Sequence, residues 1–115
     1  MKFIIGAIAV VLLTGCVTAS DLKSGSPTFT SATPKTPKQY ALCVFPKWQD
    51  LNPGSTLTET ETGYRLVMGN PGVGQTDELL EISSSDHGSV VHQYQRISWQ
   101  QMGRSGVSEA VKKCI

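Results

Sequence analysis

An apolar run near the start of the chain is the sequence feature that most constrains the fold. Residues 3–13 read FIIGAIAVVLL and follow one positive charge, at Lys2. A membrane-spanning helix needs roughly 20 apolar residues, so this run is too short to cross a bilayer. A buried core helix is the alternative, but such a helix would carry polar positions at helical spacing, and this run has none. The run is instead typical of the apolar region of a secretory signal.

The residues that end the run make the prediction more specific. They are Leu13, Thr14, Gly15 and Cys16. This LTGC sequence resembles the lipobox of bacterial lipoproteins. The resemblance implies that residues 1–15 are a signal peptide, that the Cys16 thiol receives a diacylglyceryl group, and that further acyl chains complete a membrane anchor. Val17 stands where lipoproteins kept in the inner membrane often carry Asp, so the outer membrane is expected. The alternative is an ordinary signal peptide cut near Ala19.

The cysteine count agrees with an exported protein. The chain has three cysteines, and lipid on Cys16 would leave two, Cys43 and Cys114. A pair of this kind is expected to form a disulfide in the oxidising periplasm. Closing a loop of about 70 residues contributes on the order of 4 kcal/mol in the chain-entropy model.

Composition divides the mature chain into two parts. Residues 16–35 are rich in Ser, Thr and Pro and show no apolar period, which predicts a flexible tether. Residues 36–115 form the expected head, a single small α+β domain in the periplasm.

Helices are predicted at both ends of the head. At the first, Thr36 and Gln39 have the spacing of a capping box and Pro37 occupies the first helical position. Pro46 is expected to end this helix, with one further turn possible before Asn52. At the other end, Ser98 opens a second capping box, before a helix that runs to Cys114 and is weakened by internal glycines.

The segment between the helices has the period of strands. Residues 56–68, 78–85 and 89–97 predict three strands, and the last two are joined by a tight turn at 86–88. The expected fold is therefore α-β-β-β-α: a small antiparallel three-stranded sheet flanked by an N-terminal and a C-terminal helix, with its ends linked by a disulfide.

No pattern in the head predicts catalysis, a metal or a cofactor. The GNPGVG sequence of residues 69–74 lacks the ending of a phosphate-binding loop, and no helix pattern follows it. His87 and His92 are too few for a metal site. The SSSDH sequence of residues 83–87 cannot form a triad from neighbouring residues. Glu59 and Glu61 are expected on one solvated strand face.

Surface residues leave binding as the expected role. Tyr64, Tyr94 and Arg96 are of types enriched at interaction hot spots. Trp48 and Trp99 belong to the same types, but helical spacing makes Trp99 a candidate for the core. With a net charge of +1, the chain shows no field that favours nucleic acid. We expect a non-enzymatic lipoprotein that contacts the membrane through its anchor and binds or supports an envelope protein. The alternatives are an inhibitor of a cell-wall hydrolase such as lysozyme and, less favoured, a small hydrolase.

Overall fold

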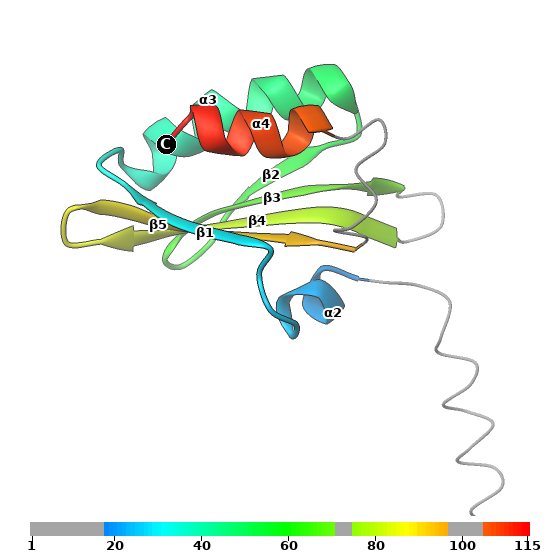
Figure 1. Cartoon of the computed structure of the whole chain (residues 1–115), viewed down its shortest axis with the longest axis horizontal. Helices are drawn as coiled ribbons and strands as arrows, with labels where there is room; N and C mark the ends of the chain where they lie inside the picture. The colour runs from blue at the N-terminus through cyan, green and yellow to red at the C-terminus, as the bar shows by residue number, and fades with distance from the viewer. Residues whose placement is uncertain (1–17, 71–74, 97–104) are drawn as a thin grey trace, which may run out of the picture.

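A computed structural model of the chain describes residues 18–70, 75–96 and 105–115. These residues contain three helices and five strands, and four of the strands follow one another between α3 and α4 (Figure 1). In chain order they are α2 (Ala19–Lys23), β1 (Phe29–Thr33), α3 (Pro37–Leu51), β2 (Thr56–Glu59), β3 (Gly63–Asn70), β4 (Gln75–Ser85), β5 (Gly88–Gln95) and α4 (Ser105–Lys113).

The five strands form one antiparallel sheet in the order β1-β5-β4-β3-β2. The α+β class is as expected, but the prediction of a three-stranded sheet is wrong. One additional strand comes from residues 56–68, which reverse direction between β2 and β3. The Thr60 amide donates to the Gly63 carbonyl at 2.9 Å, and the Gly63 amide donates to Thr60 Oγ1 at 3.1 Å. These two bonds close the turn, although the alternation of Thr with Leu and Glu continues through it to Thr62.

The other additional strand comes from the segment expected to be a flexible tether. Strand β1 pairs with β5, with Thr30 opposite His92 and Thr33 opposite Ser89. Its residues alternate between half-buried and exposed, and the strand ends on a buried Thr33. Only Phe29 is a large apolar residue in β1, so the strand carries little of the apolar alternation by which a strand is predicted.

Helix α3 begins as predicted but does not end where predicted. Thr36 and Gln39 form both bonds of the capping box, so this part of the prediction is confirmed. The helix then continues through Pro46 to Leu51, so the predicted end at Pro46 is wrong. Pro46 is exposed, whereas Tyr40, Val44 and Trp48 are fully buried at a spacing of one helical turn. Burial of that face outweighs the loss of one backbone hydrogen bond at Pro46.

The helices lie on both sides of the sheet. Helices α3 and α4 cover one side together, and the short helix α2 lies against the other (Figure 1). The main core fills the space between the sheet and the α3–α4 layer. The predicted capping box at Ser98 and the predicted core residue Trp99 fall outside the described residues.

Strand register assigns side chains to the two faces, because residues directly opposite one another share a face. We call the side under α3 and α4 the core face. One row across it consists of Leu57, Leu66, Leu80, Gln93 and Phe29. We call the other side the α2 face. One row across it consists of Thr58, Arg65, Glu81, His92 and Thr30.

Candidate functional site

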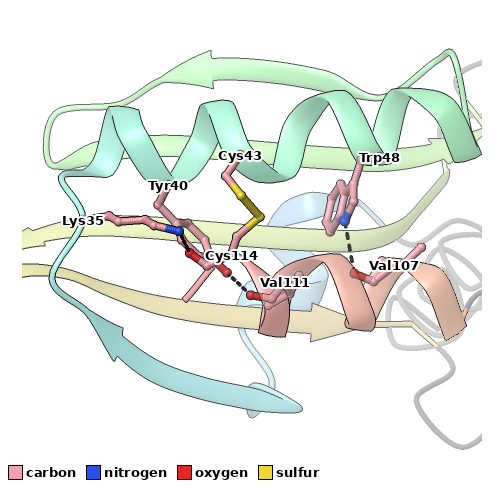
Figure 2. Close-up of a disulfide and its surroundings, with 7 residues drawn as sticks. All are labelled: Lys35, Tyr40, Cys43, Trp48, Val107, Val111 and Cys114. Carbon is pink, nitrogen blue, oxygen red and sulfur yellow. Dashed lines mark hydrogen bonds between the residues drawn. A yellow bond between two sulfur atoms is a disulfide. The ribbon is translucent and has the colours of Figure 1, made fainter.

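The predicted disulfide is present at the joint between α3 and α4. Cys43 and Cys114 are bonded, with their Cα atoms 5.8 Å apart (Figure 2). The Tyr40 hydroxyl donates to the Val111 carbonyl at 2.7 Å, and Trp48 Nε1 donates to the Val107 carbonyl at 3.3 Å. Tyr40 and Trp48 thus flank Cys43 on α3, and both reach backbone carbonyls of α4.

Burial gives two of these groups a structural role. Trp48 is fully buried, so it is a core residue and contributes nothing to an exposed binding surface. Burial also raises the pKa of the Tyr40 phenol well above its ordinary value. The phenol therefore stays protonated and continues to donate to Val111. A further bond, from the Lys35 ammonium to the Cys114 carbonyl, holds the end of the chain (Figure 2).

The three residues predicted as a binding surface do not form one surface. Tyr64 lies on the core face, opposite Ile82, and packs against the core. Tyr94 lies on the α2 face, opposite Leu79. Arg96 follows β5 and pairs through Nε with Asp77 Oδ1 at 2.6 Å. Tyr94 lies on a face that also carries exposed polar groups, and the Arg96 guanidinium is engaged by Asp77.

A charged group at the centre of the α2 face was missed by the sequence analysis. Arg65 Nε donates to Glu81 Oε1, and Lys23 of α2 places its ammonium 4.0 Å from the same oxygen. His92 lies opposite Glu81 on the neighbouring strand. The Glu81 side chain is only 11% exposed, whereas those of Arg65 and Lys23 are 36% and 53% exposed. The two cations therefore face solvent while their shared carboxylate does not.

One signal in the sequence could have located this group. The tight turn at residues 86–88 was predicted, and a turn of this length fixes the register of its two strands. In the structure Ser85 pairs with Gly88, and counting back along both strands places Glu81 opposite His92. The partner across β3 could not be found in this way, because the connection between β3 and β4 gives no comparable signal.

A second polar cluster lies on the core face, where it is buried. Glu78 and Gln93 are almost fully inaccessible to solvent. Gln93 Nε2 lies 3.4 Å from Glu78 Oε1 and 3.2 Å from Ser108 Oγ. Gln95 Nε2 lies 3.3 Å from both Glu78 Oε2 and Ser108 Oγ. Amide donors offset the cost of burying the carboxylate, and the cluster joins β4, β5 and α4.

A shallow groove runs between α3 and α4 on the outer side of the helix layer. Its volume is about 240 Å³, which is below the usual range for small-molecule sites. The residues that line it are Lys47, Asp50, Leu51, Gly106, Glu109, Ala110 and Lys113. Lys113 lies 2.9 Å from Glu109 and lowers the pKa of that carboxyl. The groove is an open depression with both signs of charge and one exposed apolar side chain, Leu51.

The remaining candidates for chemistry are dispersed. His87 lies in the exposed turn between β4 and β5, away from His92 on the sheet. The expectation that Glu59 and Glu61 share a strand face is wrong, because β2 ends at Glu59 and Glu61 lies in the following turn. Residues 71–74 of the glycine-rich sequence are outside the described residues, and strand β4 follows them. Within 18–70, 75–96 and 105–115, no three metal-ligating side chains come together.

No helix in the described part of the chain is long and apolar enough to cross a membrane.

Comparisons with known proteins find no relative of this chain. No protein-family model, no curated protein and no solved structure matches this chain.

Proposed function

We propose that this protein is a bacterial lipoprotein, anchored to the outer membrane through Cys16, whose head binds or supports another component of the envelope. The observation that carries the proposal is the accounting of its three cysteines. Two of them are joined in the head as Cys43–Cys114, which leaves Cys16 as the remaining thiol. That cysteine directly follows an apolar run and completes the LTGC sequence.

The disulfide supports an exported head. Disulfides persist in the periplasm and are rare in the reducing cytosol. A domain of this size also gains a large share of its stability from one such bond. An anchor at Cys16 agrees with the same compartment, since several acyl chains on one residue give stable attachment at about 0.8 kcal/mol per buried CH₂.

The surface of the head supports binding as its role. Leu42 and Leu51 of α3 are half exposed, at 53% and 50%. On the other side of the sheet, Arg65 and Lys23 present charge to solvent, and the half-buried Tyr94 lies on the same face. Mixed apolar and charged surfaces of this kind are typical of weak or transient protein contacts.

Intact mass of the mature protein, purified from membranes in detergent, tests the anchor. We expect a chain that begins at Cys16, carries acyl chains there and lacks the two thiol hydrogens of Cys43 and Cys114. The matched control is Cys16→Ser, which should leave the membrane fraction and retain the disulfide. A mature chain that begins after Cys16, or that carries no lipid, would contradict the proposal.

Cross-linking on intact cells, followed by identification of the captured protein, tests the role of the head. Probes at Leu42 and Tyr94 sample the two sides of the molecule. A stoichiometric envelope protein captured at either position supports the proposal. Capture of a cell-wall hydrolase whose activity falls on binding would favour the inhibitor instead.

A further inference from the structure

Helix α2 is attached to the sheet although it is too short to be stable alone. It has five residues, from Ala19 to Lys23, and Thr18 and Asp21 form a capping box at its start. Isolated helices below about 12 residues are marginal in water, so contacts with the sheet must hold it. Ala19 and Leu22 are its half-buried residues, three positions apart and hence on one side of the helix.

The sheet provides both apolar and charged contacts for α2. The helix lies against β4 and β5 on the α2 face (Figure 1). On that face Leu79 is fully buried although it lies outside the main core cluster. Glu81, two residues further along β4, approaches the Lys23 ammonium to 4.0 Å. The docked helix thus has an apolar contact and an ionic one.

Docking of α2 limits how far the head can lie from the proposed anchor. Cys16 precedes Thr18 by two residues, and two residues span at most about 7 Å. Without docking, the chain from Cys16 to Phe29 could extend to roughly 45 Å. The distance between the head and the membrane therefore depends on whether α2 is docked. With α2 docked the head lies close to the membrane, and with α2 released it is held by a long tether.

We infer that the α2 face rests on the lipid surface and that the α3–α4 layer faces away from it. The inference rests on the proposed lipid at Cys16. The cations Arg65 and Lys23 are exposed on this face and share a carboxylate that is only 11% exposed, while Asp21 of α2 adds one exposed negative charge. Exposed cations next to an anchor are attracted to the phosphates of anionic headgroups.

This orientation assigns different partners to the two sides of the head. The α2 face contacts phospholipid headgroups. The groove between α3 and α4, with the exposed Leu51 at its edge, is then the surface presented to envelope proteins. Release of α2 would free the head to reach further without breaking its core, since α2 contains no fully buried residue.

Fluorescence quenching on vesicles tests the orientation. The mature lipoprotein is reconstituted in vesicles of phosphatidylethanolamine and phosphatidylglycerol that contain a headgroup spin label. One fluorophore is placed at exposed Thr58 on the α2 face through Thr58→Cys, and in a second sample at exposed Gln49 on α3 through Gln49→Cys. We expect the label at residue 58 to be quenched severalfold more strongly than the label at residue 49.

Two changes to the chain distinguish the effect of α2 docking from the effect of the lipid anchor alone. Leu22→Asp should release α2 and remove the difference between the labels, whereas Ser26→Asp adds the same charge at an exposed site outside the helix and should preserve it. Inserting about ten Gly-Ser residues between Val17 and Thr18 leaves the head sequence intact and lengthens the link by roughly 18 Å, so it should also lower quenching at residue 58.

The outcomes distinguish this inference from the proposed function. A mature protein without lipid on Cys16 overturns both. A lipidated protein whose two labels are quenched alike overturns only the orientation, as does a difference that persists in both the Leu22→Asp variant and the lengthened chain.

Discussion

Cys43 and Cys114 join α3 to the end of α4 across 71 positions of sequence, with their Cα atoms 5.8 Å apart. The bond is part of a seam between the two helices, in which Tyr40 and Trp48 donate to carbonyls of α4. The Val111 carbonyl is one of the last four of α4, which have no partner within the helix, so it depends on the Tyr40 donor. The Val107 carbonyl, which accepts from Trp48, lies in the first turn of α4. The disulfide and these hydrogen bonds therefore stabilise the same contact.

Removing the disulfide should greatly reduce the stability of the head. For a closed loop of this length the chain-entropy model gives a loss of about 4 kcal/mol, a large share for a small domain. We expect the double variant Cys43→Ala and Cys114→Ala to be largely unfolded at 37 °C, as monitored by circular dichroism and urea titration. If the double variant has the same melting temperature as the oxidised parent, the disulfide does not stabilise the fold.

Removing the Tyr40 hydroxyl should weaken the seam without changing its shape. Tyr40→Phe leaves the Val111 carbonyl buried without this donor, which costs about 1–3 kcal/mol. Urea unfolding measures the loss. Tyr64→Phe is the matched control, because Tyr64 is only partly buried and lies on the other side of the core. Equal losses in the two variants would contradict a specific role for the Tyr40 bond.

The same tyrosine should make stability depend on alkaline pH. Burial raises the pKa of Tyr40 in the folded protein, whereas the unfolded chain ionises near the ordinary value of about 10. The contribution is therefore complete below pH 10 and is lost as the pH rises further, because the unfolded state then releases a proton that the folded state retains. We expect the free energy of unfolding to fall more steeply above pH 10 in the parent than in Tyr40→Phe. Parallel curves for the two proteins would contradict this account.

Some features of the fold were predictable because local patterns specify them. The capping box at Thr36 and the turn before Gly88 depend on a few adjacent residues. The disulfide was predicted from the cysteine count together with the assignment of Cys16 to the lipobox. Direction reversal inside residues 56–68 has no such signal, because the placement of Thr at every second position in β2 continues unchanged through the turn, at Thr60 and Thr62.

Other features depend on contacts between distant residues. Strand β1 forms because β5 offers an edge to it, and its own residues are mostly small and polar. Pro46 is tolerated because the opposite side of α3 is buried. The pair of Arg65 and Glu81 requires the register of β3 on β4, which local sequence does not determine. The sequence therefore predicted individual elements better than their pairing.

Gly88 should be irreplaceable where β5 meets the end of β1. Its φ is 138°, which L side chains rarely adopt, and a Cβ there would lie 2.1 Å from the Thr33 carbonyl oxygen. Gly88→Ala must therefore strain the turn and displace β1, at a cost of roughly 1–3 kcal/mol for the backbone alone. Thermal unfolding measures the loss. Gly25→Ala is the control, since a Cβ at Gly25 makes only an ordinary contact at 3.6 Å. A Gly88→Ala variant as stable as that control would contradict the strain argument.

Replacing Gly106 by Ala should increase the stability of the protein, although the added Cβ would lie close to Leu51. It lies in α4, where Ala is favoured over Gly by up to about 1 kcal/mol. The added Cβ would lie 3.3 Å from Leu51 Cδ1, at the end of a flexible side chain that is half exposed and can move into solvent. We therefore expect Gly106→Ala to increase the free energy of unfolding, measured by urea titration. The Leu51→Ala background provides the control: the gain should persist there, because helix propensity is its cause. If Gly106→Ala destabilises the parent but stabilises the Leu51→Ala background, the prediction is wrong. The Leu51 side chain is then held at the edge of the groove and cannot move away from the added Cβ.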